Sequence, residues 1–270
     1  KALEEAYAKA ECPVVSNNSA HRHTPDVPMT IPEINPGHLD IIPAQRKRLG
    51  TKRGFIAVKS NCSLQSYLPA MAIINEKYPI DKSIVTTYQA ISGAGKTFNT
   101  WPEMVDNLIP YIGGEEMKSE VEPNKILGEI KDGEIVPSNA LQIECQTYRV
   151  PVSDGHTAAI FFSFKDSENK PSVEEIQNMW KEFKGEPQKL NLPHAPKQFI
   201  HVYTEDETPD QPQIKTAREI DGGMAISCGR LRNSTQFDYK MVSMSHNTLR
   251  GAAGGAVLLA WPLKRMSADQ

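Results

Sequence analysis

The sequence lacks the features that define several common classes of protein. Its 270 residues carry a net charge of −3, which provides no basic surface for nucleic acid or for an anionic membrane. No apolar run approaches the ~18 residues of a membrane span, and the first residues do not form a signal-peptide pattern. We therefore predict a cytoplasmic protein that binds neither nucleic acid nor a membrane.

Cysteine is scarce, and metal-binding patterns are missing. The cysteines are isolated and form no C-x-x-C pair: they are Cys12, Cys62, Cys145 and Cys228. This spacing fits neither a disulfide framework nor a zinc site, and it favours a reducing compartment. The histidines of a proline-rich segment show no metal-ligand spacing and are expected at the surface: they are His21, His23 and His38. The sequence therefore predicts no metal centre.

Glycine is sparse where a dinucleotide-binding turn would stand. Within residues 1–60 the only glycines are Gly37, Gly50 and Gly54, and they do not cluster. A dinucleotide site needs a glycine-rich turn between its first strand and first helix. If the protein uses a nicotinamide cofactor, most of the domain that binds it would therefore precede Lys1.

The feature that is present, and that organises the chain, is Cys62. It follows an apolar run at 54–58 that predicts a buried strand, and it precedes apolar residues at helical spacing over 64–74. We expect Ser60 or Asn61 to cap that helix. A thiol at a helix N-terminus is stabilised as the thiolate, so we predict a pKa for Cys62 below the ~8.5 of a free thiol. The alternative is an inert cysteine that fills the core.

The remaining pattern alternates strands with helices. Strands are predicted at 83–89, 141–152, 157–165, 199–204, 224–231 and 237–243, and helices at 1–10, 172–183 and 246–265. A charged helix beginning at Glu115 is expected to present a solvated face. The Asp154-Gly155 pair predicts a hairpin between the strands at 141–152 and 157–165. This alternation indicates a mixed α/β or α+β sheet domain.

Six stretches share their order and spacing with one known family. They are Ser-Asn-Cys-Ser at 60–63, Thr-Tyr-Gln-Ala-Ile-Ser-Gly at 87–93, Gly-Glu-Glu-Met-Lys at 114–118, Arg-Val-Pro-Val at 149–152 leading to Gly155-His156, Gly-Arg-Leu-Arg at 229–232, and the run from His246 to Gly255. Together they resemble the aspartate-β-semialdehyde dehydrogenase family, in particular its archaeal and fungal branch, over nearly the whole chain.

The resemblance implies a fold and a domain organisation. The expected fold is α/β (α+β): a catalytic and dimerisation domain like that of glyceraldehyde-3-phosphate dehydrogenase, with a mixed sheet and flanking helices, plus remnants of a Rossmann-type cofactor domain. Residues 1–60 would belong to the NADP-binding domain, 61–244 to the catalytic and dimerisation domain, and 245–270 to a C-terminal helix that returns to the cofactor domain. The family's opening nucleotide-binding segment would precede Lys1.

The resemblance also implies an activity. It is the reversible, NADP-dependent reductive dephosphorylation of β-aspartyl phosphate to aspartate semialdehyde, a step toward lysine, threonine and methionine. Cys62 matches the nucleophile, His156 the general acid/base, and Gln89 the residue that orients the acyl intermediate. The chemistry agrees, because an acyl phosphate needs a nucleophile that forms a thioester, and imidazole exchanges protons near neutral pH.

The family's ligand-binding residues also have matches in this chain. Arg149 matches the arginine that binds the substrate carboxylate, where a guanidinium fork gives a bidentate contact. The other substrate matches are Glu115 for the amino group, Lys118 and Arg22 for the phosphate, and Asn61 beside the nucleophile. Toward the cofactor, Asn247 matches the contact to the nicotinamide amide, and Ser92 and Gly93 are expected near substrate or cofactor.

Two alternatives remain. N-acetyl-glutamyl-phosphate reductase and glyceraldehyde-3-phosphate dehydrogenase use the same thiol and histidine logic, although their sequences around the nucleophile differ from Ser-Asn-Cys-Ser. The chain could instead be a non-catalytic dimerisation module that is inactive without its nucleotide-binding half. In either case we expect a homodimer or a homotetramer.

Overall fold

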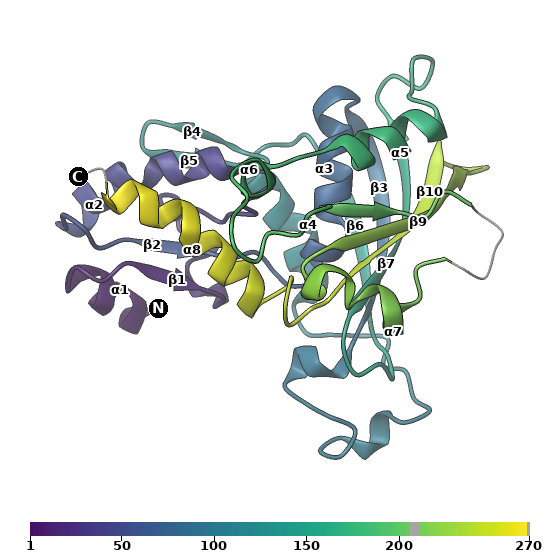
Figure 1. The fold of residues 1–270 in the computed structure, drawn as a ribbon, viewed down its shortest axis with the longest axis horizontal. Helices are drawn as coiled ribbons and strands as arrows, with labels where there is room; N and C mark the ends of the chain where they lie inside the picture. Colours follow the sequence, from purple (N-terminus) through teal and green to yellow (C-terminus); the bar gives the residue numbers. More distant parts are fainter. Residues whose placement is uncertain (206–210, 269–270) are drawn as a thin grey trace.

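The protein forms a small lobe and a larger sheet domain, and several segments of the chain pass between them (Figure 1). The computed structural model describes residues 1–205 and 211–268. Its α-helices are α1 (Ala2–Lys9), α2 (Ile42–Leu49), α3 (Leu68–Lys77), α4 (Glu115–Ile126), α5 (Val173–Glu182), α6 (Glu186–Lys189), α7 (Ile214–Ala217) and α8 (Ala253–Ala268). Its strands are β1 (Val14–Ser16), β2 (Ile56–Val58), β3 (Ile80–Gln89), β4 (Glu129–Lys131), β5 (Glu134–Val136), β6 (Ile143–Arg149), β7 (His156–Phe164), β8 (Ile200–Val202), β9 (Ile226–Asn233) and β10 (Tyr239–Ser245).

The larger domain is built on a six-stranded mixed sheet in the order β6-β3-β7-β10-β9-β8. The outer pairs β6–β3 and β8–β9 are parallel, and the inner pairs are antiparallel. Helices α3 and α5 pack against one face, where Met71 and Trp180 join a hydrophobic cluster with Val85 and Ile160 of the sheet. This confirms the predicted mixed sheet with flanking helices.

Helix α4 closes the β6 edge of the sheet. Two of its carboxylates accept hydrogen bonds from backbone N–H groups of that edge strand: Glu116 from Thr147 and Glu120 from Cys145, each at 3.2 Å. An edge strand otherwise presents unpaired N–H groups that can recruit another strand. The helix is therefore fixed to β6 by polar contacts, and its remaining buried face is directed toward the segment that contains Cys62.

The prediction of a hairpin at Asp154-Gly155, which would join β6 directly to β7, is wrong. Strand β3 lies between β6 and β7, pairing in parallel with one and antiparallel with the other. The connection at 150–155 therefore passes over the end of β3 rather than forming a two-residue turn. Gly155 adopts φ +98° there, a conformation that favours glycine, which explains why the sequence resembles a turn.

The small lobe contains the parallel pair β1–β2 flanked by α1, α2 and α8. Helix α8, drawn in yellow in Figure 1, crosses back from the sheet domain to this lobe, where Leu259 and Leu263 pack with Leu39, Ile42 and Phe55. The predicted helix at 246–265 begins later than expected, at Ala253, because residues 246–252 form turns. Among the described residues, none of the helices combines the length and hydrophobicity that crossing a bilayer requires.

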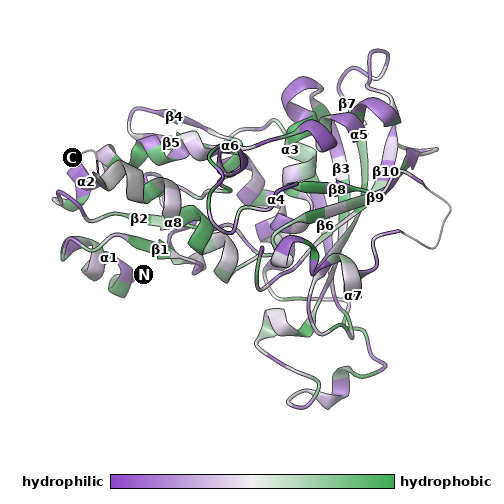
Figure 2. Cartoon of the chain, in the orientation of Figure 1, coloured by the Kyte–Doolittle hydropathy of each residue, from purple (hydrophilic) through white to green (hydrophobic). Residues whose placement is uncertain are grey.

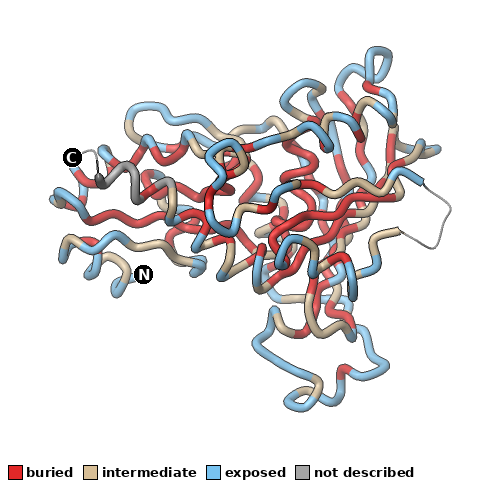
Figure 3. Tube along the Cα trace, in the orientation of Figure 1, coloured by how far each residue is buried: buried red, intermediate tan, exposed pale blue. Residues whose placement is uncertain are grey.

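Hydrophobic residues and buried residues coincide in both the small lobe and the sheet domain. The green, apolar strands of Figure 2 coincide with the red, buried segments of Figure 3 in the sheet and in β2. The segment between β3 and α4, at the bottom of Figure 1, is mostly exposed in Figure 3 and presents apolar side chains to solvent: Val105, Leu108 and Tyr111. On the sheet, the same is true of Ile84 and Tyr88 of β3 and Phe161 of β7.

Candidate active site

The pairing register of three strands places three of the predicted residues in one row. Gln89 ends β3, and it lies opposite Arg149 at the end of β6 and opposite His156 at the start of β7. Paired residues point to the same face of a sheet, and all three side chains here are buried. Residues separated by up to 67 positions in sequence are thus brought side by side by backbone hydrogen bonds.

Cys62 meets this row from outside the sheet. Its Sγ lies 3.5 Å from Nε2 of His156, and the thiol is partly exposed. The other ring nitrogen, Nδ1, accepts a hydrogen bond from the backbone N–H of Ala90 at 3.1 Å. A ring nitrogen that accepts a hydrogen bond carries no hydrogen, so the neutral ring has its proton on Nε2, facing the sulfur.

The prediction of a lowered pKa for Cys62 is wrong in direction. Burial raises the pKa of the thiol, and Glu115 adds to the increase, while Lys59, Arg22 and Arg149 only partly oppose it. The expected helix dipole is also weak, because a three-residue 3-10 helix follows and α3 begins only at Leu68. The expected cap is partly present: Oδ1 of Asn61 accepts hydrogen bonds from the N–H and the hydroxyl of Ser63, each at 2.7 Å.

Burial also governs His156. It lowers the pKa of the ring to about 4, although a backbone hydrogen bond to Gly155 opposes the shift. The imidazolium is therefore rare at neutral pH, and the resting pair consists of a thiol and a neutral ring. Ionisation of Cys62 thus depends on what binds beside it.

Helix α4 is not solvated as predicted; one face of it is buried against the site. Glu115 accepts hydrogen bonds from Nδ2 of Asn61 at 2.9 and 3.0 Å, from Nε2 of Gln89 at 3.2 Å and from Lys118 at 2.7 Å. Burial acts to raise the pKa of Glu115, but these bonds, the strongest of them to Lys118, together outweigh burial and hold the pKa below its usual value. Three of the predicted site residues therefore donate to the carboxylate of a fourth, Glu115.

Arg22 lies at the same end of the site and is almost fully buried. Its Nε donates to the carbonyl of Lys59 at 3.0 Å, Nη1 to Glu122 at 2.8 Å and Nη2 to the carbonyl of Asn17 at 2.9 Å. Sequence reasoning missed Glu122 and also Lys125, whose ammonium donates to the carbonyl of Arg22 at 2.8 Å. The signal available was their helical spacing from Glu115 and Lys118.

Arg149 and Gly93 adjoin His156. Nη1 of Arg149 donates to the carbonyl of Ala90 at 2.6 Å, so the peptide groups of Ala90 hold both the arginine and the histidine. Gly93 lies over both side chains, because a Cβ built on it would be 3.0 Å from Nη1 of Arg149 and 3.3 Å from Nε2 of His156. Because residue 93 is glycine, no side chain presses on the two groups at this point.

The other predicted cofactor residues, Asn247 and Ser92, lie next to the turn that precedes His156. Oδ1 of Asn247 accepts a hydrogen bond from the N–H of Gly155 at 2.7 Å, and its Nδ2 donates to the hydroxyl of Ser92 at 3.0 Å. Asn247 therefore fixes the turn that carries His156, and one hydrogen of its amide is not used in these contacts. All eleven predicted residues thus belong to one connected region of the protein.

Lys59, three residues before Cys62, is a second missed feature. It is fully buried, and its ammonium donates to the carbonyl of Gly251 at 2.9 Å. The side chain fits only because Gly255 has no side chain: a Cβ there would lie 2.1 Å from Cε of Lys59. Burial, together with Arg250, lowers the pKa of Lys59 well below its usual value.

Other expectations near the site are corrected. His21 and His38 are buried rather than at the surface: His38 contacts Asn35 and the carbonyl of Gly128, and His21 contacts Thr24. Within residues 1–205 and 211–268, no three His, Cys, Asp or Glu side chains are grouped so as to hold a metal ion.

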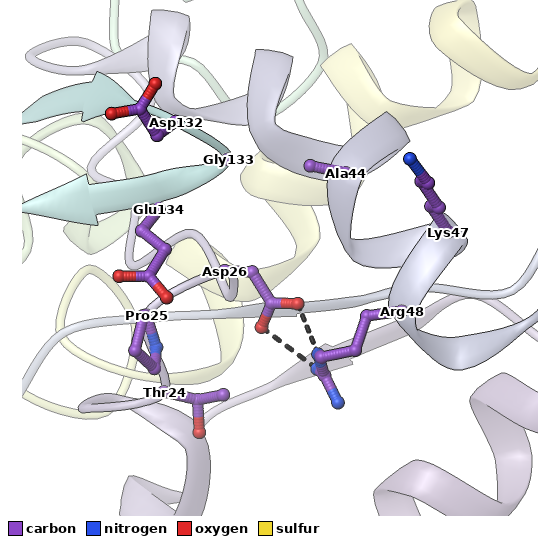
Figure 4. A pocket seen from close by; sticks show the side chains of 9 residues that line it. All are labelled: Thr24, Pro25, Asp26, Ala44, Lys47, Arg48, Asp132, Gly133 and Glu134. Atoms are coloured by element: carbon purple, nitrogen blue, oxygen red, sulfur yellow. Dashed lines mark hydrogen bonds and ion pairs between the residues drawn. The ribbon is translucent and has the colours of Figure 1, made fainter.

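A cavity of about 720 Å³ lies apart from the thiol, between α2 and the β4–β5 hairpin (Figure 4). Its charged side chains include Arg48 and Asp26, which pair across it, with Nη2 of the arginine 2.9 Å from Oδ1 of the aspartate. None of its lining residues belongs to the predicted site.

The thiol of Cys62 contacts the buried imidazole of His156, and Arg149 lies beside them. Two further cations, Arg22 and Lys118, are each paired with a carboxylate of α4. This arrangement suits an enzyme that forms an acyl intermediate on cysteine and releases an anion. Comparison with known proteins agrees: residues 71–250 match the semialdehyde dehydrogenase dimerisation domain. The chain belongs to the aspartate-semialdehyde dehydrogenase family. The resemblance drawn from its motifs is confirmed.

Individual relatives cover nearly the whole chain. It is 42% identical to the aspartate-semialdehyde dehydrogenase of Saccharomyces cerevisiae over 270 residues, 96% of this chain and 73% of that protein. It is 40% identical to that of Aspergillus fumigatus, over 96% of this chain and 72% of that protein. The crystal structure of the Candida albicans enzyme with NADP superposes with a TM-score of 0.87 at 37% identity, covering all of this chain and 75% of the other.

The depressed pKa of His156 makes the protein sensitive to acid. The unfolded chain takes up a proton near the ordinary value of 6.5, whereas the folded ring resists protonation until about pH 4, so stability is lost as the pH falls between these values. His156→Asn keeps an acceptor for the N–H of Ala90 and cannot titrate. Between pH 7 and pH 5 its free energy of unfolding should fall by about 2 kcal/mol less than that of the wild type.

Urea unfolding at the two pH values measures this difference. His23→Asn, at an exposed position, is the matched control, and its free energy of unfolding should fall between the two pH values as that of the wild type does. Equal losses in His156→Asn and the wild type would contradict the buried, neutral ring.

Proposed function

We propose that this chain catalyses the NADP-dependent reductive dephosphorylation of β-aspartyl phosphate to aspartate semialdehyde, in the cytoplasm, on the route to lysine, threonine and methionine. The observation that supports it most is the 3.5 Å approach of Sγ of Cys62 to Nε2 of His156, next to the buried Arg149. The membership of the family and the likeness to the Candida albicans enzyme with NADP agree with it.

Cys62 is the nucleophile of this reaction. Its sulfur attacks the acyl carbon of the substrate, the bond from that carbon to the phosphate oxygen breaks, and a thioester and inorganic phosphate result. In the second half, the hydride for the thioester carbon would come from NADPH held beside Asn247, Ser92 and Gly93, while this chain supplies the proton donor for the oxygen and the sulfur that leaves as the aldehyde is released. The nearby cations Lys59, Arg22 and Arg149 favour the thiolate that both steps require.

His156 moves the proton between sulfur and substrate oxygen. In the tautomer favoured by the N–H of Ala90, the hydrogen is on Nε2 and can be donated to the sulfur or to the oxygen. To accept the proton of the thiol, Nε2 must be free of hydrogen, so the ring must change tautomer or pass its hydrogen to the substrate first.

The two acidic groups of the substrate are bound by different residues. Arg149 uses one N–H on the carbonyl of Ala90 and offers its other donors to the carboxylate. Arg22 and Lys118 face the phosphate, while Glu115, which already accepts bonds from both Lys118 and Asn61, contacts the substrate amino group. Gln89 orients the acyl group from the centre of the row.

The residues around His156 fit a nicotinamide. Gly93 presses no side chain on the ring, and Asn247 has an amide hydrogen available beyond its bond to Ser92. NADP supplies or accepts the hydride when it is bound there. The chain's own contribution is to hold the turn at Gly155 and to exclude water from the buried Nε2 of His156.

The proposed division of the chain is 1–60 as part of the NADP-binding domain, 61–244 as the catalytic and dimerisation domain, and 245–270 as a helix returning to the cofactor domain. The packing of α8 residues Leu259 and Leu263 against Phe55 supports the assignment of the last segment. The separate parallel pair β1–β2 supports that of the first.

We further propose that two copies associate through the open face of the large sheet. On this face Ile84, Tyr88 and Phe161 are 37–40% exposed, and Tyr88 stacks on Tyr148 at 5.9 Å between ring centroids. Apolar side chains in adjacent strands, on the face not covered by α3 and α5, form a surface suited to a second sheet. The match to a dimerisation domain family supports a homodimer, or a homotetramer of two such dimers.

Arg149→Lys tests the role of the guanidinium fork. Lysine keeps the positive charge but cannot make the bidentate contact to a carboxylate, so kcat/KM for aspartate semialdehyde should fall about 100-fold through misplacement of the substrate. The assay follows NADPH formation with aspartate semialdehyde, phosphate and NADP. The exposed Arg53→Lys is the control and should match the wild type.

Wild-type kinetics in Arg149→Lys would show that the guanidinium fork does not bind the carboxylate. The same assay on this chain and on a form extended at its N-terminus separates catalysis by the chain from the alternative of a dimerisation module, which predicts activity only in the extended form.

Phe161→Asp tests the association surface. A carboxylate in the middle of an apolar contact cannot be hydrated once two copies meet, so the variant should elute as a monomer where the wild type is a dimer or tetramer. Leu190→Asp is a matched control, because Leu190 is also 37% exposed but lies outside the sheet. Light scattering after size exclusion gives the masses, and an unchanged mass for Phe161→Asp would place the interface elsewhere.

A further inference from the structure

We propose that Glu122 is a positioning residue that sets the distance between the phosphate-binding Arg22 and the nucleophile Cys62. This inference rests on the proposed function, since it assumes that Arg22 binds the phosphate of the substrate. It concerns a side chain in the middle of α4 that the sequence pattern did not single out.

Glu122 is the most deeply buried carboxylate of the site, with 1% of its surface exposed. Its two oxygens have different partners. Oε1 accepts a hydrogen bond from Nη1 of Arg22 at 2.8 Å, and Oε2 accepts one from the backbone N–H of Asn61 at 2.7 Å. A single carboxylate therefore connects the guanidinium to the backbone of Asn61, the residue immediately before Cys62.

This carboxylate also decides how Arg22 presents its donors. Three N–H groups of the guanidinium are used by Glu122 and by the carbonyls of Lys59 and Asn17. Of its five donors, one on each terminal nitrogen then remains for an anion. Because Lys59 and Asn61 belong to the same segment as Cys62, the direction of these two donors is fixed relative to the sulfur.

The reaction needs that fixed relation. The phosphate and the acyl carbon of an acyl phosphate are separated by one oxygen, so a phosphate bound at Arg22 places the carbon within reach of Sγ only if both groups keep their spacing. Misplacement by about 1 Å can reduce such a reaction 100-fold. Glu122 bonds directly to the Arg22 side chain and to the Asn61 peptide, and so holds this spacing.

Two neighbours on α4 reinforce the arrangement. Asn61 is held a second time by Glu115, seven residues before Glu122 and thus on the same face of the helix. Lys125 donates to the carbonyls of Arg22 at 2.8 Å and Thr24 at 2.6 Å, which fixes the backbone of the arginine. The helix therefore contacts both the Arg22 segment and the Cys62 segment.

A different role for Glu122 would be to neutralise the charge of a buried arginine and nothing more. Glu122→Asp distinguishes the two. It retains the negative charge and can still pair with Arg22, but it is one methylene shorter and cannot reach the N–H of Asn61 at the same time. Glu129→Asp, on the exposed strand β4, is the matched control.

Two measurements on the full chain need no nucleotide. Calorimetry gives the dissociation constant for inorganic phosphate, and iodoacetamide with mass mapping gives the alkylation rate of Cys62 with and without phosphate. In the wild type, phosphate should bind and slow the alkylation. In Glu122→Asp we expect the dissociation constant for phosphate to rise about tenfold, which is the weakening produced when phosphate loses one well-placed charge-assisted contact. We also expect the alkylation rate of Cys62 without phosphate to change at least about threefold.

The double variant Arg22→Gln/Glu122→Asp, compared with Arg22→Gln, shows whether Glu122 acts on phosphate through the arginine. The positioning role predicts no further loss of phosphate affinity in the double variant. Thermal melts confirm folding of each protein.

The outcomes separate the two proposals. Phosphate affinity and alkylation in Glu122→Asp equal to the wild type would overturn the positioning role while leaving the proposed function in place. A wild type that neither binds phosphate nor shows protection of Cys62 would overturn the phosphate site itself, and with it the proposed function.

Discussion

The register between β3 and its two neighbours is the constraint on which the site depends. Pairing places Arg149, Gln89 and His156 in one row across three strands, all on the covered face of the sheet. A slip of one residue in β3 would turn Gln89 toward the open face and exchange it with Tyr88. Alternation along the strands thus directs this row to the covered face and Ile84 and Tyr88 to the open face, so that a single set of hydrogen bonds fixes both.

The polar interior around this row explains how charged groups are kept in place without solvent. Glu115 and Glu122 each receive several hydrogen bonds, and their partners Lys118 and Arg22 neutralise them. Removing one member of such a buried pair costs about 3–5 kcal/mol, because the remaining charge is left unpaired. The same desolvation raises the pKa of Cys62 and lowers that of His156. The resting pair of thiol and imidazole is therefore uncharged, and only the cations Lys59, Arg22 and Arg149 act to lower the pKa of Cys62.

Features set by local sequence were predictable, and features set by distant contacts were not. The strand at 83–89 and the helix at 172–183 follow from hydrophobic periodicity and, for the helix, from the Ser172 cap, which the structure retains. The hairpin at Asp154-Gly155 was wrong because β3 inserts between its two strands. The burial of α4 was missed because charged residues are usually solvated, and only Arg22 and Asn61, far away in sequence, reveal its role. His156, Arg149 and Gln89 were found through motif order and not through any local pattern.

Acyl transfer to one sulfur is the central step, and it can be observed without nucleotide. The chain is mixed with β-aspartyl phosphate, quenched in acid, digested and mapped by mass spectrometry, while released phosphate is counted. We predict an aspartyl adduct on Cys62 with one phosphate released per adduct, much slower formation in His156→Asn, and none in Cys62→Ala. An adduct on Cys12, or unchanged acyl phosphate with Cys62 unmodified, would contradict this role of the sulfur.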